Sequence, residues 1–452
     1  MDTTEARYGE MARKMVETGD WLVPLHDYGV PYLAKPPLAF WLSAAGIALF
    51  GPGELGPRLL ILLATVAFAL ASFVYVRRWL GSATALTALL VMATSLLFFV
   101  AAAAVMTDML LSISVAIALG AFWERYRGGG GGAELALYVA LGLGLLIKGP
   151  LAVVLALAPI ALWAFVFRRV RAVWQRFAWI KGGLLALAIA APWYIAAELR
   201  NPGFLSYFIV GEHIRRFLVP GWSGDMYGRA HDVPRGGIWL FFLLGALPWG
   251  LLAVPWLLTA RARVRARWRE HRELVAFWLF SALVPLLLFT FAGNIIFPYA
   301  LPALPPAALV LAALASDDDA RSLPRLAAAA LAMTLAVTAA TWAARSYIED
   351  HSQRAVVRAA VVRAHDDQAQ VYYWQARYFS ADYYGRGRVR VVEDAAPLAR
   401  DLAAHREFAL VVPERRLGSV PAQIVEHMLR VDAVDSMLVL VPDYAAHTVV
   451  AR

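Results

Sequence analysis

The sequence predicts a polytopic α-helical membrane protein of about ten or more spans, with a small α/β domain at its C-terminal end. The chain is 61% apolar and only 17% charged, whereas soluble globular chains carry roughly 25% charged residues. The deficit is concentrated in long charge-free runs. The run at 274–316 is long enough for two helices of the roughly 20 residues that a bilayer requires.

Ten spans are expected between residues 57 and 344. Their approximate limits are 57–76, 81–103, 107–123, 134–147, 150–167, 182–198, 236–259, 274–291, 296–314 and 325–344. The chain then divides into an outer-face N-terminal segment with juxtamembrane helices (1–56), a transmembrane core (57–345) and a C-terminal α/β domain (346–452).

The tail after the last span has a different pattern. Short β-rich runs alternate with helical patterns, which indicates an α/β domain. Its length is sufficient for a core of its own. The expected strands are Val371–Trp374, Val389–Val392, Phe408–Val412 and Met437–Val441, and the expected helices lie near Ala395–His405 and Ile424–Leu429.

Basic residues favour one set of alternate loops. These loops hold 17 arginines and lysines, whereas the short loops of the other set hold only Lys148. The 199–235 loop of that second set carries five arginines, but longer loops weigh less in this rule. Because basic loops stay in the cytoplasm, residues 1–56, Asp108, Lys148, the 199–235 loop and the tail are expected outside the inner membrane. Residues 1–56 would then need export, so we expect a further spanning helix encoded upstream of Met1.

Composition excludes two classes of function. The chain has no cysteine, which excludes disulfide and thiol chemistry. Its net charge of +9 does not indicate a nucleic-acid partner, because the arginines fall in short loops between apolar spans and do not form one patch.

The N-terminal segment carries two acids, Asp2 and Glu5, followed by Arg7 and Tyr8. Asp2 could cap the helix that follows, with Glu5 in its first turn. Alternatively, an acidic pair at the outer surface removes a proton or binds a cation. The residues alone leave both interpretations open.

Three charged residues interrupt apolar stretches. Lys35 precedes Pro36, which favours extended geometry, so its ammonium would project to headgroup depth and suit a phosphate. Asp108 interrupts an otherwise charge-free stretch and is a functional candidate. Lys148 is a basic functional candidate on the same grounds, because it also interrupts an apolar stretch. The alternatives are a snorkelling Lys35, a helix-capping Asp108 and a Lys148 that complements a helix C-terminus.

The loop at 199–235 contains a further polar group. Ile214 and Phe217 recur at helical spacing opposite Glu212 and Arg216, which indicates an amphipathic helix at the membrane surface. Glu212 and His213 could also ligate a metal, although adjacent residues do not form a recognised ligand spacing.

These residues fall in motifs that resemble the C-type glycosyltransferase superfamily, and within it the branch of the lipid A aminoarabinose transferases, akin to the protein O-mannosyltransferases. The motifs run in order across residues 5–305. They are Glu5-Ala6-Arg7-Tyr8, Thr18-Gly19-Asp20-Trp21-Leu22-Val23-Pro24, Val30-Pro31-Tyr32, Lys35-Pro36-Pro37, Thr107-Asp108-Met109, Lys148-Gly149-Pro150, Pro192-Trp193-Tyr194, Asn201-Pro202-Gly203-Phe204, Glu212-His213, Arg216-Phe217, and Tyr299 with Leu301-Pro302-Ala303-Leu304-Pro305.

The resemblance implies an enzyme that transfers a sugar from a polyprenyl-phosphate donor at the outer face of the inner membrane. The acceptor would be lipid A-like, a glycan or a protein, and direct displacement would invert the anomeric carbon. The candidate catalytic acids are Asp2, Glu5 and Asp108; the candidate donor-phosphate contacts are Arg7, Tyr8, Lys35 and Lys148; and Glu212, His213 and Arg216 are candidate acceptor or metal contacts.

The sequence departs from the family pattern at two positions. Thr4 stands where the family commonly has Asp, so the choice between Asp2 and Glu5 as key acid stays open. Ala34 stands where relatives often carry Glu, so a carboxylate that could hold a divalent cation is missing. No cofactor is expected with certainty, and a divalent cation stays an open alternative.

Two other classes of function fit the sequence less well. A flippase or transporter for a lipid-linked sugar would show inverted repeats with paired broken helices, and no internal repeat is evident. An assembly protein that binds a partner through its tail would not need Asp2, Lys35, Asp108 and Lys148 on one face.

The loop pattern predicts the orientation of the chain. A reporter that is active only outside the cytoplasm should be active when fused after Arg345 and silent when fused at Arg265, because the basic loops stay in the cytoplasm. Reporter activity in whole cells, normalised to fusion protein, measures this. The reverse pattern would overturn the orientation.

Overall fold

The computed structural model describes residues 3–228, 233–315, 322–344, 352–364, 369–434 and 436–444. The chain forms two compact units. A helical unit comprises Lys14–Thr338, and a second unit combines Met1–Arg13 with Ala339–Arg452. Asp2 lies outside the described residues.

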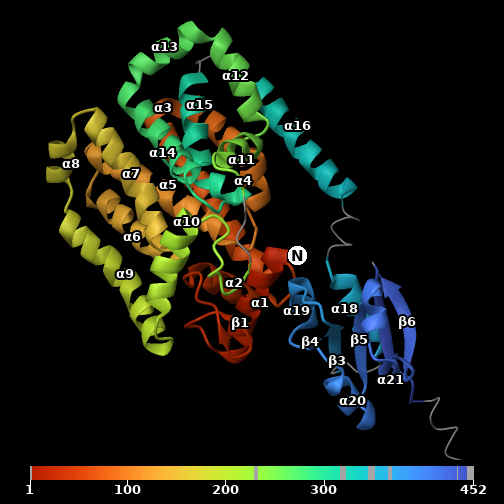
Figure 1. Ribbon diagram of the computed structural model, residues 1–452. Coiled ribbons are helices and arrows are strands. Elements are labelled where there is room, and N and C mark those ends of the chain that lie inside the picture. The colour runs from red at the N-terminus through yellow and green to blue at the C-terminus, as the bar shows by residue number, and fades with distance from the viewer. Residues whose placement is uncertain are drawn as a thin grey trace, which may run out of the picture. The chain divides into compact units, whose positions relative to one another are not determined.

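The helical unit is built almost entirely from helices (Figure 1). Helix α1 (Thr3–Thr18) begins in the second unit and ends in the helical unit, where a hairpin of β1 (Leu25–Asp27) and β2 (Val30–Pro31) follows it. The helices that follow are α2 (Leu38–Phe50), α3 (Gly56–Ala93), α4 (Leu96–Ala101), α5 (Thr107–Tyr126), α6 (Gly131–Lys148), α7 (Pro150–Val166), α8 (Val170–Arg176), α9 (Trp179–Arg200), the π-helix η1 (Ser206–Arg215), α10 (Arg216–Leu218), α11 (Gly237–Gly245), α12 (Trp249–Thr259), α13 (Arg261–Glu270), α14 (Arg272–Thr290), the 3₁₀-helix η2 (Phe297–Ala303), α15 (Leu304–Ala315) and α16 (Ser322–Ala343).

Several of these helices suit a bilayer. Within the described residues, six are long and apolar enough to cross it, or seven if one bent pair counts as a span. The six are Gly56–Ala93, Thr107–Tyr126, Gly131–Lys148, Trp179–Arg200, Arg272–Thr290 and Phe297–Ala315. The polytopic helical fold is confirmed, and the expected number of about ten spans is confirmed only in part.

The difference in span number has local causes. A loop was expected at Arg77-Arg78, but α3 continues through both arginines and kinks at Gly81, whose φ of 82° is readily adopted only by glycine. The span expected at 236–259 is instead the pair α11 and α12, bent by 91°. Pro248 stands at this break, where it cannot donate a hydrogen bond to the preceding turn. Helix α7 is apolar but only 17 residues long.

An aromatic cluster joins three of the long helices. Trp123 of α5 packs against Trp163 of α7 with ring centroids 5.5 Å apart, and Phe122 packs against Phe277 of α14 at 5.6 Å. Rings of this size bury much apolar surface and pack edge-to-face or offset. The cluster holds α5 and α7 side by side. It thereby helps to position the start of α5, which carries Asp108.

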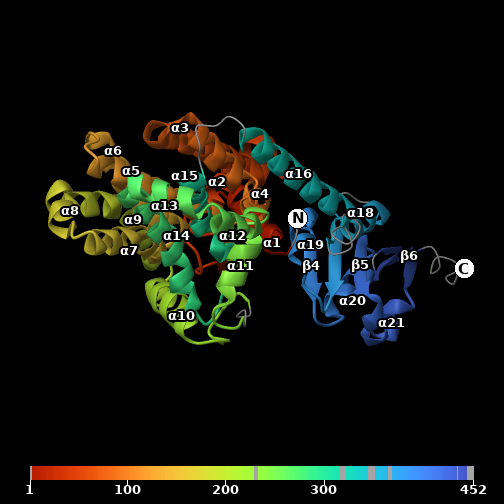
Figure 2. The same ribbon diagram turned by 90° about the horizontal axis from the view of Figure 1, so that it is seen from above.

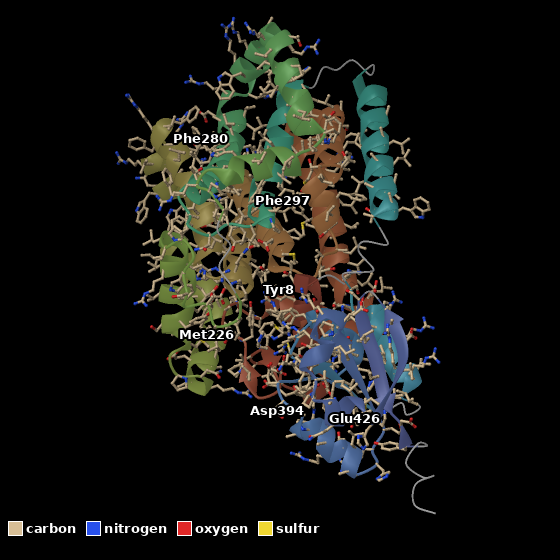
Figure 3. The ribbon with its side chains drawn as sticks, turned by 45° about the vertical axis from the view of Figure 1, so that its right-hand side comes forward. Tyr8, Met226, Phe280, Phe297, Asp394 and Glu426 are labelled. Atoms are coloured by element: carbon tan, nitrogen blue, oxygen red, sulfur yellow. The ribbon has the colours of Figure 1, made fainter. Side chains whose placement is uncertain are left out.

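The two ends of the helical unit differ in chemistry. The arginine-rich helices α8 and α13 lie toward one end, and the β1–β2 hairpin lies toward the other (Figure 1). Phe280 of α14 lies on the α13 side, Met226 lies near the opposite end, and Phe297 lies between them (Figure 3). The loop around Met226 and the arginine-rich helices are therefore well separated. Which end faces the cytoplasm stays a prediction.

The second unit contains a five-stranded sheet. Its strands are β3 (Gln370–Trp374), β4 (Val389–Val392), β5 (Phe408–Pro413), β6 (Met428–Val434) and β7 (Met437–Pro442), in the order β4-β3-β5-β7-β6. Strands β4, β3 and β5 are parallel, and β7 pairs antiparallel with β5 and β6. The helices are α18 (Arg354–Arg363), α19 (Phe379–Gly385), α20 (Ala396–Ala403), the 3₁₀-helix η3 (Glu414–Ser419) and α21 (Ala422–Val425).

Each face of this sheet has its own apolar core. Helix α18 covers one face, while α20 and α21 lie on the other (Figure 2). All six residues of β5 are buried, as are all six of β7, because both strands are covered on both faces. The four strands expected in the tail are confirmed to within one residue at each end.

One expectation for the tail was wrong. The helix expected near Ile424–Leu429 is the short α21, which ends at Val425, and Met428 begins strand β6. Strand β6 is an edge strand with most of its residues partly or fully exposed. The sequence did not predict this strand because an edge strand is less buried than an inner one, and β6 therefore carries polar residues that break the apolar pattern.

Helix packing in the core gives a testable contrast between two adjacent glycines of α9. A methyl group on Gly182 would overlap the buried ring of Tyr138 in α6, whereas one on Gly183 would meet open space. Overpacking costs about 1–3 kcal/mol, so Gly182→Ala should lower the thermal unfolding midpoint in detergent. Gly183→Ala is the matched control and should leave it unchanged or raise it. Equal midpoints for the two variants would contradict the packing of α6 on α9.

Candidate active site

Five of the predicted residues line one polar cavity of about 70 Å³ in the helical unit. The polar lining is Lys35, Lys148, Glu212, His213, Arg216 and Asn294, and the remaining lining is Leu151, Phe217, Phe289, Ala292 and Tyr299. These residues come from segments that are far apart in sequence. A cavity with three basic side chains at the edge of an apolar bundle is suited to an anion.

Backbone contacts hold the segment before Lys35 in place. The hydroxyl of Tyr227 donates to the carbonyl of Pro31 at 2.8 Å and accepts from the amide of Leu33 at 3.0 Å. The ring of Tyr227 also packs against Tyr32, with centroids 4.7 Å apart. Since Pro36 prevents a helix at Lys35, this segment stays extended and delivers the lysine side chain to the cavity.

Glu212 is the centre of the charge cluster. Its carboxylate lies 3.1 Å from the ammonium of Lys35 and 3.2 Å from the guanidinium of Arg216, and it accepts from the hydroxyl of Tyr207 at 3.0 Å. The side chain is only 2% exposed. Burial alone would raise the pKa of Glu212, but Lys35 and Arg216 outweigh it and hold that pKa below its ordinary value. Glu212 is therefore ionised at neutral pH.

Arg216 joins this cluster to the loop that follows. It donates to a carboxylate oxygen of Asp225 at 2.8 Å, and the other oxygen of Asp225 accepts from the amide of Tyr227 at 2.9 Å. Burial opposes the charge on Arg216, but Glu212, Tyr299 and Asp225 together raise its pKa. The guanidinium is thus a permanent cation with two carboxylate partners.

Asp108 and Lys148 form a second, buried pair. Asp108 lies in the first turn of α5 and Lys148 is the last residue of α6, and their side chains meet at 2.5 Å with 7% of each exposed. The ammonium also lies 4.4 Å from the ring centroid of Tyr299, a cation–π contact. Asp108 therefore neutralises Lys148, and the start of α5 is capped by no side chain, as Met106 is the residue before it.

His213 is held between two carbonyl oxygens. Its Nδ1 lies 2.8 Å from the oxygen of Phe208, and its Nε2 lies 3.1 Å from the oxygen of Lys148. Burial lowers the pKa of His213 below its ordinary value, although both carbonyls favour the protonated ring. The ring is neutral at pH 7, so it donates a hydrogen bond to only one of the two carbonyls, that of Phe208 in η1 or that of Lys148 at the end of α6.

Asn294 attaches the loop to the turn between α14 and η2. Its amide donates to the carbonyls of Arg216 at 2.6 Å and Val219 at 2.8 Å, and the amide of Gly293 donates to Phe217 at 2.6 Å. From the sequence, Asn294 was placed only in the short connection between the spans expected at 274–291 and 296–314. The contacts of Asn294 were missed because they join segments remote in sequence, whereas Asp225 contacts Arg216 and Tyr227 of its own loop.

The remaining predicted residues lie in the second unit. Glu5, Arg7 and Tyr8 belong to α1, where Arg7 lies over the rings of Tyr8 and Phe379 at 5.5 Å and 5.4 Å. Their expected roles as acid and phosphate contacts stay predictions, as does that of Asp2, which lies outside the described residues. The helix expected around Glu212 is present as η1 and α10.

Metal binding finds little support in the part of the chain that the structure describes. No group of three or more His, Asp or Glu side chains there could hold a metal ion. Glu212 and His213 do not converge on a common point, because Glu212 is occupied by Lys35 and Arg216 while both ring nitrogens of His213 face carbonyl oxygens.

Comparison with known proteins identifies the fold. The dolichyl-phosphate-mannose-protein mannosyltransferase family matches residues 34–195. The undecaprenyl phosphate-alpha-4-amino-4-deoxy-L-arabinose arabinosyl transferase of Edwardsiella ictaluri is 32% identical over 319 residues, which cover 68% of this chain and 54% of that protein. The first such transferase of Sodalis glossinidius is 34% identical over 322 residues, with the same coverage. The chain is similar to the aminoarabinose transferases. The resemblance to C-type glycosyltransferases is thereby confirmed.

The structural comparison extends over nearly the whole chain. The crystal structure of ArnT from Cupriavidus metallidurans bound to undecaprenyl phosphate superposes with a TM-score of 0.79 at 20% identity, covering 98% of this chain and 94% of that one. Its apo state gives a TM-score of 0.77. At this identity the likeness shows a common fold. The chain spans about half the length of the curated relatives that it matches.

The contribution of the Asp108–Lys148 ion pair to stability can be measured. Removing one partner of a buried ion pair costs about 3–5 kcal/mol, because it leaves an uncompensated charge. Asp108→Asn and Lys148→Met should each lower the thermal unfolding midpoint in neutral detergent, and the double variant should lose less than the sum of the two. Arg169→Gln, which breaks an exposed pair with Glu273, is the control and should cost about 0–1 kcal/mol. Additive losses would contradict a coupled buried pair.

Proposed function

We propose that this protein is an integral membrane glycosyltransferase. It moves a sugar from a polyprenyl-phosphate donor to a lipid A-like, glycan or protein acceptor at the outer face of the inner membrane. The proposal is supported by the aminoarabinose transferases among its relatives and by the undecaprenyl phosphate bound in the ArnT crystal structure that shares its fold. The observation that carries it is the cavity where Lys35, Lys148 and Arg216 converge.

The donor phosphate is proposed to bind at Lys35 and Arg216. Both cations share the carboxylate of Glu212, and their side chains are 17% and 19% exposed, whereas that of Lys148 is 7% exposed. A phosphate that entered the cavity would meet these two groups first. Guanidinium and ammonium groups form strong charge-assisted hydrogen bonds with phosphate oxygens.

Transfer is proposed to proceed by direct displacement. An acceptor oxygen attacks the anomeric carbon, and the bond between that carbon and the phosphate oxygen breaks. The acceptor proton passes to a carboxylate, for which Asp2, Glu5 and Asp108 are the candidates from the sequence. The polyprenyl phosphate leaves with an added negative charge, which Lys35 and Arg216 stabilise in a site with little water. One displacement inverts the anomeric carbon.

The hydrocarbon tail of the donor needs an apolar path. A groove of about 540 Å³ lies among α3, α5, α6, α14 and α15. Its lining is almost wholly apolar and includes the ion pair of exposed Arg78 with half-buried Glu124. We propose that this groove takes part of the isoprenoid chain. Burial of apolar surface there would add affinity in proportion to the area covered.

One feature would also suit the alternative, a flippase of a lipid-linked sugar. The bent pair α11 and α12 is a broken helix of the kind that transporters use. Transporters of this type usually carry such helices in pairs from repeated halves, and the described residues contain one bent pair. The transferase is therefore the better-supported function.

Replacement of Lys35 tests the proposal. Lys35→Met keeps the length of the side chain and removes its charge. A preorganised charge facing a developing anion contributes about 10²-fold to the rate. Because Glu212 keeps Arg216 as its partner, the variant should still accumulate, and it should lose nearly all transfer. The assay follows sugar transfer from a polyprenyl-phosphate donor to extracted acceptor lipids, normalised to protein level.

Lys181→Met is the matched control. Lys181 is exposed on α9 and forms no ion pair with any described residue, so this variant should transfer at the wild-type rate. Near-normal transfer by Lys35→Met would reduce Lys35 to an interface anchor. Absence of transfer by the wild type with every acceptor fraction would reject the proposed function itself.

A further inference from the structure

The sheet of the second unit bears a hollow of about 750 Å³ that the proposed transfer reaction does not use. It lies on the sheet face that α20 covers, beside β3 and β4. Its volume falls in the range of small-molecule sites, about 300–1,000 Å³. The residues that matter for its chemistry are Tyr372, Arg390, Arg400, Asp401, His405 and Arg406.

The lining of the hollow includes a buried polar pair. The hydroxyl of Tyr372 donates to a carboxylate oxygen of Asp401 at 2.6 Å, and both residues are buried. Burial, together with the neighbouring carboxylate of Asp401, raises the pKa of Tyr372 to about 12, so the phenol keeps its proton.

The rim carries an excess of positive charge. Arg390 of β4 and Arg400 of α20 are exposed, and neither forms an ion pair with any described residue. Both lie close enough to the hydroxyl of Tyr372 for their charges to oppose the rise in its pKa. Arg406 adds a third guanidinium, 3.5 Å from Asp401. Glu407 is the one other acid in the lining.

Other arginines of this unit do find carboxylates. Arg377 pairs with Asp382 at 3.1 Å, and Arg363 pairs with Asp432 at 3.7 Å. Arg390 and Arg400 share the lack of a carboxylate partner with the exposed Arg430 of β6, and differ from it in lining the hollow. The hydroxyl of Tyr444 donates to the backbone carbonyl of Arg406 at 2.6 Å, and the ring of Tyr444 stacks on His405. These contacts fix the loop that carries Arg406.

We propose that this hollow binds a phosphate monoester on a sugar or lipid head group. The phosphate would take the guanidinium groups of Arg390 and Arg400, whose planar forks match its oxygens. The space beyond them would hold the group that carries the phosphate. The site belongs to the second unit and does not depend on the proposed transfer reaction.

Ligand binding to the full-length protein in neutral detergent tests this site. Every protein in the experiment carries Lys35→Met, which weakens phosphate binding at the candidate active site. Equilibrium dialysis with radiolabelled glucose 1-phosphate gives the affinity. The combined change Arg390→Gln and Arg400→Gln should weaken binding by about tenfold or more, since each charge-assisted hydrogen bond contributes at least that much.

Two further variants serve as controls for the loss of Arg390 and Arg400. Arg430→Gln removes an exposed arginine of β6 that lines no part of the hollow, and should leave the affinity unchanged. Replacing Arg390 and Arg400 with lysine keeps both charges, so binding should fall less than with glutamine. Retained thermal unfolding midpoints show that the variants are folded.

Competition identifies the source of the phosphate. Dihexanoyl phosphatidic acid that displaces glucose 1-phosphate in an arginine-dependent manner would indicate a lipid head group, and failure to displace it would indicate a sugar phosphate. Equal affinity of the glutamine variant and its parent for both probes would overturn the proposal. Because no transfer is measured, this result is independent of whether the protein proves to be a glycosyltransferase.

Discussion

The neutralisation of buried charge around Glu212 is the constraint on which the candidate site depends. Three cations, Lys35, Lys148 and Arg216, meet three carboxylates, those of Asp108, Glu212 and Asp225. In an apolar bundle a charge without a partner is costly, and breaking one buried pair is strongly destabilising. The cluster is neutral as it stands. An incoming phosphate must therefore take cations from carboxylates that already hold them, which favours a ligand with strong, multidentate oxygen acceptors.

Hydrogen bonds next to the charge cluster explain how segments remote in sequence form one site. Tyr227 fixes the strand that leads to Lys35, and Asn294 fixes the loop that carries Arg216. The ring of His213 packs between that loop and the end of α6, with Nε2 3.1 Å from the carbonyl oxygen of Lys148. These neutral hydrogen bonds set the positions at which the charges meet. Substitutions at Tyr227 or Asn294 should thus disturb the charge cluster without removing any charge from it.

The sequence predicted the parts of this structure that depend on local pattern. The apolar runs gave the long helices, and the alternation in the tail gave strands β3, β4, β5 and β7. Lys35 and Asp108 were found because a charge in an apolar stretch is conspicuous. Asn294 escaped because its residue type is ordinary in a turn and its partners are remote in the chain, and Asp225 escaped because an acid is ordinary in a polar loop. The kink at Gly81 and the break at Pro248 escaped because hydrophobicity does not report the direction of a helix.

The central claim is that the cations around Glu212 hold the phosphate of a polyprenyl-phosphate lipid. Direct binding of radiolabelled polyprenyl phosphate to the purified full-length protein tests it without any need to know the sugar or the acceptor. Binding should saturate at one lipid per chain and weaken by about tenfold or more in Arg216→Gln, because a charge-assisted contact is lost. Arg200→Gln, which breaks an exposed pair with Asp20, should bind as the wild type does. Equal affinity of Arg216→Gln and the wild type would contradict the account.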